Sequence, residues 1–495
     1  MNDLQAHALE VALLRRNVFV TGSGGTGKTF WIHSLCETLL RDRYGGSKER
    51  FGEAVVLVAP TGIAATAIGG STINSSLGIG IPVRIEDFDK VRRPQNRRRI
   101  AKWEVMVIDE VSMLSGDFLE QLDRVLRSVR PSSAHLPFGG VQIICVGDFY
   151  QLPPIFNKAA YGFKNAGFAF QAEAWRQAGF VTVVLDKPFR QEGDRRFARL
   201  LNKVRSADAE SAAMALADIA AECRNGCRRM AERLQQGGVE PADDGIRPTR
   251  IYALNVDVDK INEQQLGDLG TPVVGFECHD TVDDSTRKKN KKYEKHEFFK
   301  GGSLKLAVGA QVMLTKTLCF ADNLVNGSRG VVVEVRKNES IVYVRFKHGV
   351  VPIGVTEFKS EVIEMHDGQP RVVILKRRQV PLKLAWAVTV HKSQGMTLDR
   401  ATLSLQSMFA SGHAYVALSR VRSLDSLEIL DMPADGRELY AWATRMINVD
   451  PLVQQFYGQL ERSVPGAALP PPPSYASAAS SASFWKNSED WKALV

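Results

Sequence analysis

The stretch Gly22-Ser-Gly-Gly-Thr-Gly-Lys28-Thr29 decides the fold class of this chain. It follows the apolar run at 17–21 and precedes the helical run at 30–40, so the pattern G-x-x-x-x-G-K-[ST] stands between a strand and a helix. In that context the glycines let backbone N–H groups surround phosphate oxygens, Lys28 supplies a positive charge and Thr29 Oγ offers a ligand to Mg²⁺. A glycine-rich turn that only happens to precede Lys-Thr is the competing interpretation, and the flanking strand and helix disfavour it.

This loop predicts a site for ATP with Mg²⁺. The residues expected to surround the nucleotide phosphates are Gly22, Ser23, Gly24, Gly25, Thr26, Gly27, Lys28 and Thr29.

Short Val- and Ile-rich runs alternate with helical stretches around the loop, at 17–21, 55–59, 105–109 and 141–148. The runs are apolar throughout rather than alternating with polar residues, which is typical of strands buried on both faces under crossover helices. The fold class predicted is therefore α/β, with a parallel sheet in the first lobe. Another such run at 180–185 marks the approximate end of this lobe.

The rest of the chain predicts a second α/β lobe with an insertion. Runs at 249–254, 401–405 and 427–430 look like strands of a second sheet, and an Ala-rich stretch at 206–238 has helical spacing. Between them, turn glycines separate short Val-rich segments near 318–380, the pattern of a small antiparallel barrel or meander. The Pro/Ala/Ser-rich stretch 464–495 is expected to be a low-complexity tail, with a docking motif as one interpretation of its aromatic tip.

Two carboxylates end the apolar run at 105–109, where the carboxyl edge of a parallel sheet faces a bound nucleotide. Asp109 is expected to join the Mg²⁺ ligands and Glu110 to orient or deprotonate the attacking water. Charge that develops on a transferring phosphoryl group also calls for cations from outside the loop, and Arg190 and Arg420 are the candidates. Either arginine taken alone is better explained as a surface ion pair, so the assignment rests on the sequences around the two arginines.

Composition excludes some classes of protein but does not identify the function. The net charge of +9 suits a polyanionic partner, and no apolar run approaches the length of about 18 residues that a membrane helix needs. Six cysteines at irregular spacing predict neither a disulfide framework nor a zinc site, which indicates a reducing compartment. The first residues carry no pattern of a cleaved signal, so we expect either that there is none or that it has been removed.

Seven motifs in order resemble superfamily 1 DNA helicases of the Pif1-like group. They are GSGGTGKT, APTGIAA (59–65), VIDEVSML (107–114), VGDFYQLPPI (146–155), FRQ (189–191), VHKSQGMTL (390–398) and YVALSRV (415–421). RecD-like helicases share some of them, but DEVSMLSGDFLEQLDRVLRSVR followed by PFGG, and RRQVPLKLAWAVTVHKSQG, look more Pif1-like. The resemblance runs from about Gln5 to the 450s.

The resemblance implies two RecA-like P-loop lobes. The expected division is residues 1–178 for the first lobe with a small wedge insert at about 75–102, residues 179–317 and 381–463 for the second, and an SH3-like barrel at 318–380. It also implies ATP-driven movement along single-stranded DNA in the 5′ to 3′ direction.

The resemblance assigns further roles to individual residues. Gln5 would contact adenine, Gln151 would sense the γ-phosphate, and Arg190 with Arg420 would be the cross-lobe cations. Gln394 and Gly395 would lie beside the phosphates.

A single strand bound without sequence preference needs a basic groove with stacking side chains. The candidates on the two lobes are Pro60, Thr61, Thr72, Asn74, Thr389, His391 and Lys392. Asn74 departs from the family pattern, which usually has histidine there; it keeps hydrogen bonding but lacks the stacking of an imidazole.

Two basic runs, at 92–102 and 287–295, have two interpretations each. A solvated loop is one. The other is DNA contact: duplex contact for the first run, near the expected wedge, and weak backbone attraction for the second.

The favoured hypothesis is an ATP-dependent 5′ to 3′ DNA helicase that unwinds single-strand-tailed or forked DNA in genome maintenance. An ATP switch that binds nucleic acid and remodels or recruits without unwinding is the alternative, and a RecD-like exonuclease subunit is disfavoured. We expect a monomer without membrane association that works in the nucleus or the mitochondrion.

Overall fold

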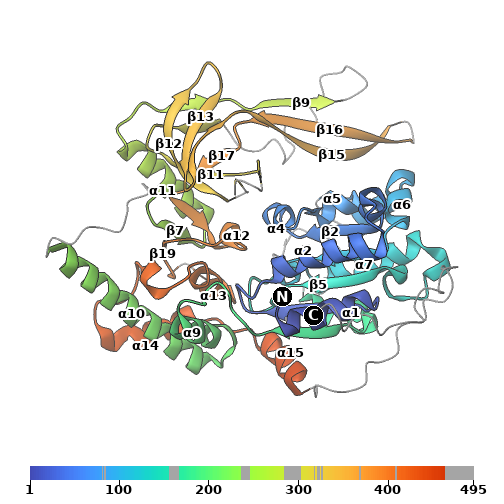
Figure 1. The fold of residues 1–495 in the computed structure, drawn as a ribbon, viewed down its shortest axis with the longest axis horizontal. Coiled ribbons are helices and arrows are strands. Elements are labelled where there is room, and N and C mark those ends of the chain that lie inside the picture. Colours follow the sequence, from blue (N-terminus) through green and yellow to red (C-terminus); the bar gives the residue numbers. More distant parts are fainter. Residues whose placement is uncertain are drawn as a thin grey trace.

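In the computed structural model, two α/β lobes lie side by side and a β-rich insertion lies over them (Figure 1). The structure describes residues 1–80, 82, 85–154, 167–235, 246–283, 303–316, 318–319, 324, 327–366, 369–406, 408 and 410–462. None of the helices in these ranges combines the length and the apolar character that a membrane span needs.

The first lobe is built on a parallel sheet with the strand order β3-β2-β4-β5-β1-β6. Its strands are β1 (Val18–Gly22), β2 (Val55–Ala59), β3 (Ser71–Thr72), β4 (Val105–Ile108), β5 (Gln142–Val146) and β6 (Val181–Leu185). β1, β4 and β5 are buried along their whole length, and two apolar cores lie against the sheet. The prediction of a parallel sheet buried on both faces is confirmed, because continuous Val/Ile runs have no polar face to turn toward water.

Helices on both sides of this sheet complete the first lobe (Figure 1). They are α1 (Asp3–Leu13), α2 (Lys28–Thr38), α3 (Lys48–Ala54), α4 (Gly62–Ala67), α5 (Ile73–Leu77), α6 (Pro94–Ala101), α7 (Gly116–Val129) and α8 (Glu173–Ala178). Several begin at a polar capping residue, such as Ser115, whose hydroxyl accepts from the Phe118 N–H at the start of α7.

The second lobe has its own parallel sheet, with the order β18-β7-β19-β20. Its strands are β7 (Thr249–Tyr252), β18 (Ala387–Thr389), β19 (Ala401–Leu403) and β20 (Leu427–Ile429), which confirms the three strands expected from the sequence. The helices that follow the first lobe are α9 (Arg195–Ser206), α10 (Ala209–Gln235), α11 (Asn255–Asp268), α12 (Val390–Ser393), α13 (His413–Leu418), α14 (Leu439–Met446) and α15 (Pro451–Arg462). The Ala-rich stretch is the long helix α10, as its spacing predicts.

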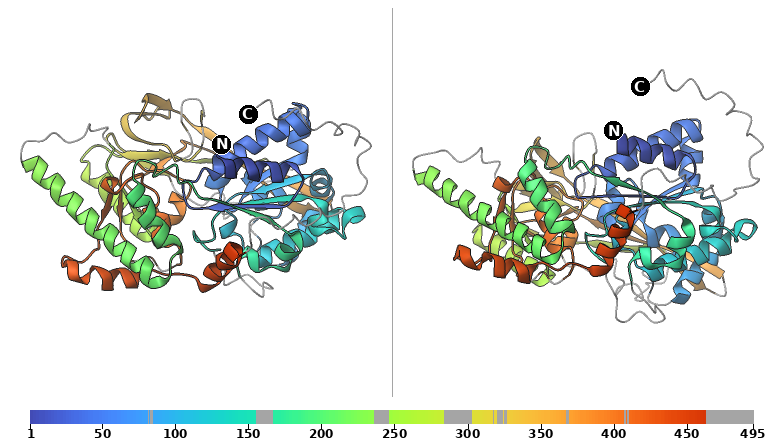
Figure 2. Two further views of the ribbon diagram at one scale, coloured as in Figure 1. Left: turned by 60° about the horizontal axis from the view of Figure 1, so that its bottom comes forward. Right: turned by 90° about the horizontal axis from the view of Figure 1, so that it is seen from below.

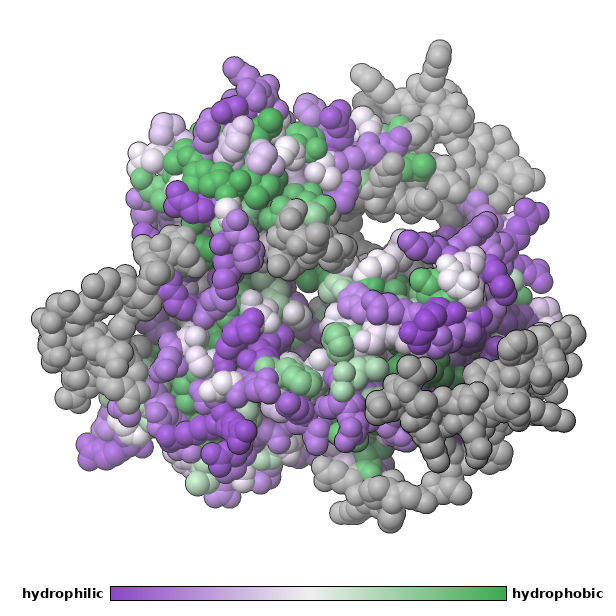
Figure 3. Space-filling view, in the orientation of Figure 1, coloured by the Kyte–Doolittle hydropathy of each residue, from purple (hydrophilic) through white to green (hydrophobic). Residues whose placement is uncertain are grey.

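The insertion consists of antiparallel sheets with a separate apolar core. One sheet has the order β14-β13-β12-β11-β17, from β11 (Gln311–Leu314), β12 (Arg329–Arg336), β13 (Ile341–Phe346), β14 (Gly349–Ile353) and β17 (Leu382–Leu384). A second contains β9 (His279–Asp283), β15 (Thr356–His366) and β16 (Gln369–Gln379), and β8 (Val274–Phe276) pairs with β10 (Leu304–Leu306). Figure 3 shows a hollow between this insertion and the first lobe, with a largely hydrophilic rim on the first-lobe side.

Three of the expected domain boundaries differ from those in the structure. β6 belongs to the first sheet, where it pairs with β1 from Val18↔Val181 to Gly22↔Leu185, so this lobe extends past residue 178. β11 and β17 lie in the sheet of the insertion, which therefore extends beyond 318–380 at both ends. α15, expected in the second lobe, packs into the first-lobe core through Val453 and Tyr457. An apolar run shows that a segment is buried but not against which sheet, and this explains all three shifts.

The chain region expected to form a small wedge is helical and packed on the first lobe. A 3₁₀ helix at Ile85–Arg92 and then α6 carry the first basic run, and their side chains Phe88, Val91 and Ile100 are buried in the first-lobe core. Residues 92–102 are therefore anchored helical structure rather than a solvated loop. The second basic run at 287–295 and the tail at 464–495 lie outside the described residues.

Candidate nucleotide site between the lobes

The glycine-rich loop joins β1 to α2 in a shape that only glycine accommodates at key positions. Gly25 has φ 87° and Gly27 has φ 81°, both in the left-handed region. A Cβ on Gly25 would lie 2.5 Å from Arg190 Cβ. The loop therefore needs its glycines both for its turns and for the close approach of the segment that carries Arg190.

Lys28 begins α2 and folds back over this loop. Its Nζ donates to the carbonyl oxygens of Gly22, at 2.7 Å, and Ser23, at 3.0 Å. Burial lowers the pKa of Lys28, and the carboxylates of Asp148 and Glu110 counteract that shift. The Lys28 ammonium thus lies at the N-terminus of a helix. Its positive charge and the free backbone N–H groups there together favour a bound anion.

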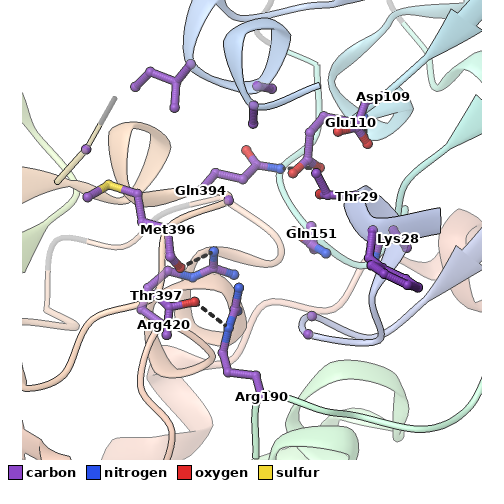
Figure 4. A pocket seen from close by; sticks show the side chains of 18 of the residues that line it. Lys28, Thr29, Asp109, Glu110, Gln151, Arg190, Gln394, Met396, Thr397 and Arg420 are labelled. Atoms are coloured by element: carbon purple, nitrogen blue, oxygen red, sulfur yellow. Dashed lines mark hydrogen bonds between the residues drawn. The ribbon is translucent and has the colours of Figure 1, made fainter. Parts of the chain in front are cut away.

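The two carboxylates Asp109 and Glu110 follow β4 on the same side of the cavity as Thr29 (Figure 4). Glu110 has φ 51°, an unusual left-handed conformation for a non-glycine residue, and its N–H donates to Asp109 Oδ1 at 2.9 Å. Burial and the neighbouring Glu110 raise the pKa of Asp109 to about 7, and burial raises the pKa of Glu110 as well. Two crowded, desolvated carboxylates beside a threonine hydroxyl gain from a bound divalent cation, so these residues fit Mg²⁺.

Gln394 connects this acidic pair to the second lobe. It follows α12, and its Nε2 donates to Glu110 Oε2 at 2.9 Å (Figure 4). Its Oε1 is buried and has no hydrogen-bond partner among the described residues. A hydrogen-bond acceptor, Gln394 Oε1, is thus available at the point where the two lobes meet.

Arg190 and Arg420 lie at the opposite end of the cavity (Figure 4). Arg190 donates to Thr397 Oγ1 at 3.0 Å and to the Ser419 carbonyl at 2.9 Å, and it thereby bridges to the second lobe. Arg420 is 2% exposed and donates to the Val416 carbonyl at 2.7 Å.

Both guanidinium groups have a lowered pKa. Burial and then the charge of Arg190 lower the pKa of Arg420 to about 9, and burial lowers the pKa of Arg190. Two desolvated cations side by side are costly unless an anion joins them. A phosphate group would meet that need.

All these groups face one cavity of about 590 Å³, within the usual size of small-molecule sites. The predicted residues among its lining are Gly24, Gly25, Gly27, Lys28, Thr29, Asp109, Glu110, Gln151, Arg190, Gln394, Gly395 and Arg420. Ile63 and Ala64 of α4 and Met396 and Thr397 of the second lobe also line it.

Gln5 is placed differently from the other predicted residues. It is 1% exposed, its Nε2 donates to the Thr26 carbonyl at 3.2 Å, and its Oε1 accepts from the Asn2 N–H at 3.1 Å. Gln5 supports the phosphate loop and caps α1 in this arrangement. Its contact with adenine stays a prediction.

Three of the predicted DNA-binding threonines are helix caps. Thr61, Thr72 and Thr389 each accept at Oγ1 from the backbone N–H three residues on, at 3.3 Å, and so begin α4, α5 and α12. Asn74, within α5, has a buried Oδ1 with no partner among the described residues.

Two of the helices capped in this way, α4 and α12, lie at the lobe boundary, because residues of α4 and those just after α12 line the same cavity. Pro60 precedes α4, while His391 and Lys392 lie within α12, and Lys392 Nζ donates to Asn255 Oδ1 at 3.1 Å.

The sequence analysis did not single out Tyr415. Its hydroxyl accepts from the Gly24 N–H at 2.7 Å, so a side chain of α13 contacts the phosphate loop of the other lobe. The signal was present, since Tyr415 opens the YVALSRV motif that also contains Arg420.

The chain is similar to known proteins in both sequence and fold. A model described as PIF1-like helicase matches residues 6–215, and one described as the 2B domain of DNA helicase Pif1 matches residues 295–335. The solved structure of Pif1 helicase from Candida albicans is 29% identical with a TM-score of 0.72, covering 93% of this chain and 99% of that one.

Curated relatives named as ATP-dependent DNA helicases match over most of the chain. One from Xenopus laevis is 34% identical over 92% of this chain, which spans 64% of that relative's length. One from a Psychrobacter species is 31% identical, with 93% of this chain and 73% of the relative covered. At that identity and coverage, and with the phosphate loop, acidic pair and cross-lobe arginines in one cavity, the chain belongs to the family of Pif1-like helicases.

Proposed function

We propose that this protein is an ATP-dependent DNA helicase that moves 5′ to 3′ along single-stranded DNA and unwinds tailed or forked duplexes. The observation that carries the proposal is the contact between Glu110 of the first lobe and Gln394 of the second, inside a cavity lined by both. A nucleotide bound there touches both lobes, so its hydrolysis changes how they fit together. The names of the relatives supply the substrates, ATP and DNA.

Lys28 and the N-terminus of α2 bind the β- and γ-phosphates in this proposal, because they present a cation and backbone N–H groups. Arg190 and Arg420 face the γ-phosphate from the other side, where they stabilise the charge of the transition state. Gln151, which also lines the cavity, hydrogen-bonds the same phosphate.

Thr29 Oγ1 and the carboxylate of Asp109 are the groups that would hold Mg²⁺. The bound cation would neutralise charge that develops on the phosphate oxygens. Glu110 then accepts a proton from, or orients, the attacking water. Gln394 holds the Glu110 carboxylate through its Nε2 and leaves Oε1 free to accept from that water.

The coupling to DNA passes through α12. This helix begins at the Thr389 cap, contains His391 and Lys392, and ends immediately before Gln394. A strand that contacts His391 and Lys392 therefore shifts the same short helix that positions Gln394 against Glu110. The caps at α4 and α5 form the opposing edge, which grips the strand alternately with α12 as the lobes close and open.

The insertion and the first basic run also have roles in the proposed helicase. We assign β11–β14 and β17 to an SH3-like barrel, supported by their antiparallel order, their separate core and a bulge between Val332 and Glu334 that bends the sheet. The exposed arginines of α6 would meet duplex DNA ahead of the single strand.

Strand displacement on duplexes with either a 5′ or a 3′ single-stranded tail tests the function. We expect ATP-dependent displacement from the 5′ tail alone, and none with Lys28→Ala, since the phosphates then lose their fixed counter-charge. DNA-stimulated ATP hydrolysis without displacement from either tail would instead support an ATP switch that binds DNA without unwinding it. Displacement from the 3′ tail alone would contradict the proposed polarity.

A further inference from the structure

The C-terminal helix α15 fastens the two lobes together behind the phosphate loop. The chain leaves the second lobe after α14 and returns to the first, where Val453 and Tyr457 join its core (Figure 2). At the same time, Gln454 Nε2 donates to the Ala207 carbonyl between α9 and α10, at 2.9 Å. One helix thus contacts both sides of the lobe boundary.

Tyr457 places a hydroxyl between two segments that build the nucleotide site. Its Oη lies 2.7 Å from Thr21 Oγ1, in the strand that leads directly into the phosphate loop. The same oxygen accepts from the Phe149 N–H at 3.2 Å, two residues before Gln151. The tyrosine is 6% exposed, so these bonds form away from water, where they are strongest.

A buried ion pair completes this network. Asp148 is fully buried and receives two hydrogen bonds from Arg205 of α9, at 2.8 and 2.9 Å. Tyr457 Oη also lies 3.4 Å from Asp148 Oδ1. Burial alone would lower the pKa of Arg205, but Asp148 more than offsets this and the pKa of Arg205 is raised.

Aromatic stacking fixes the orientation of the hydroxyl. The rings of Tyr457 and Tyr150 stack at 4.6 Å with an angle of 15°, and the Arg205 guanidinium lies 4.7 Å from the centre of the Tyr150 ring. Phe456 next to it packs against Phe170 at 4.3 Å. The ring of Tyr457 therefore has no freedom to swing its hydroxyl away.

We propose that Tyr457 is a positioning residue for ATP hydrolysis: its hydroxyl sets the distance between the phosphate loop and the segment 148–151 that carries Gln151. The inference rests on the proposed function. Tyr457 lies behind the site, since it lines a separate cavity of about 640 Å³ with Gly22, Ser23 and Gly24 and is not among the residues that line the nucleotide cavity. It acts through Thr21 and Phe149, and a misplacement of the groups they carry slows a reaction that depends on alignment.

The test is Tyr457→Phe in the full chain, which removes the hydroxyl and keeps the stacked ring. We expect kcat of the DNA-stimulated ATPase to fall about tenfold, with KM for ATP changed by less than about twofold, because alignment rather than binding is lost. Tyr440→Phe removes the same atom from an exposed site, 45% accessible, and is expected to behave as wild type.

Val453→Ala separates positioning from packing. It weakens the same helix in the same core without touching the hydroxyl, so it should lower the melting temperature more than Tyr457→Phe and leave kcat within about twofold of wild type. Equal kcat losses in the two variants would overturn the inference, because α15 would then act only through stability.

Thr21→Val tests whether Thr21 is the hydrogen-bond partner through which Tyr457 acts. If the two hydroxyls act through their shared hydrogen bond, the double variant with Tyr457→Phe loses no more kcat than the worse single variant. If the kcat losses of the two single variants instead multiply in the double variant, Tyr457 does not act through Thr21. Wild-type kcat in Tyr457→Phe would overturn the inference and leave the helicase proposal intact, whereas a wild-type chain without DNA-stimulated hydrolysis would overturn both.

Discussion

The two walls of the nucleotide cavity differ in their electrostatics. On the first-lobe wall, the Lys28 ammonium lies among carboxylates that counteract part of the lowering of its pKa by burial. On the facing wall, burial and then the charge of Arg190 lower the pKa of Arg420 to about 9, against an opposing effect of Glu110. The first wall holds both a cation and carboxylates before any ligand arrives, while the second presents a pair of like charges that an anion would stabilise.

This difference separates two tasks. A wall that carries both signs of charge can hold a phosphate at its cation and a metal cation at its carboxylates, and it serves binding and chemistry. A wall of unbalanced cations gains most when negative charge accumulates in front of it, which is the situation of phosphoryl transfer. We therefore expect changes in the first wall to abolish the reaction, and changes in the second to slow turnover more than they weaken binding.

Glu110→Gln should give the largest effect. The amide keeps the shape and a hydrogen-bonding oxygen near Gln394 but cannot accept a proton, so kcat for ATP should fall by about 10³-fold while nucleotide affinity is retained. Single-turnover hydrolysis together with equilibrium binding of a fluorescent ATP analogue measures both. A kcat within about tenfold of wild type would remove Glu110 from the chemistry.

Arg420→Ala should have a smaller effect confined to turnover. Loss of one cation from the second wall should lower kcat by about 10²-fold and weaken ATP binding by less than about fivefold, since the first wall is intact. Arg437→Ala is the matched control, because its side chain is 92% exposed and it lies outside the cavity. Equal losses of binding and turnover would indicate a folding role and erase the proposed contrast between the walls.

The same contrast explains which parts could be predicted from the sequence. Residues 22–29 and the pair Asp109-Glu110 are contiguous motifs at the ends of strands, so local pattern and parallel-sheet geometry are enough to bring them together. The second wall joins Arg190 to Thr397, 207 residues away. Spacing alone could not predict that contact, and the family resemblance implied only that Arg190 and Arg420 are cross-lobe cations.

Other features carry no distinguishing signal in the sequence. The apolar face of α15 predicts burial, yet nothing in its residues says that it returns to the first lobe. Gln5 shows the converse, because the resemblance gives it a role toward adenine while the structure shows bonds to Asn2 and Thr26. Local competition for hydrogen bonds decides such cases, and only coordinates reveal it.

The pH dependence of stability offers the smallest and most direct probe of the first wall. With a pKa near 7 in the folded protein and an ordinary value of 3.8, Asp109 binds a proton in the folded state between these limits that the unfolded chain does not bind. The stability from this group is full below the lower value and is lost as pH rises through the upper one, by about 1 kcal/mol per pH unit within the window.

The melting temperature of the ligand-free protein should therefore fall from pH 5 to pH 7 less steeply in Asp109→Asn than in wild type, and the variant should melt higher at pH 7. Mg²⁺ with a non-hydrolysed ATP analogue should flatten the wild-type slope too, because a bound cation lowers the pKa of Asp109. Arg420→Ala should keep the wild-type slope, since it alters the other wall. Identical slopes for wild type and Asp109→Asn would mean that the carboxylate is ionised in the empty site, and that the first wall needs no cation to hold it.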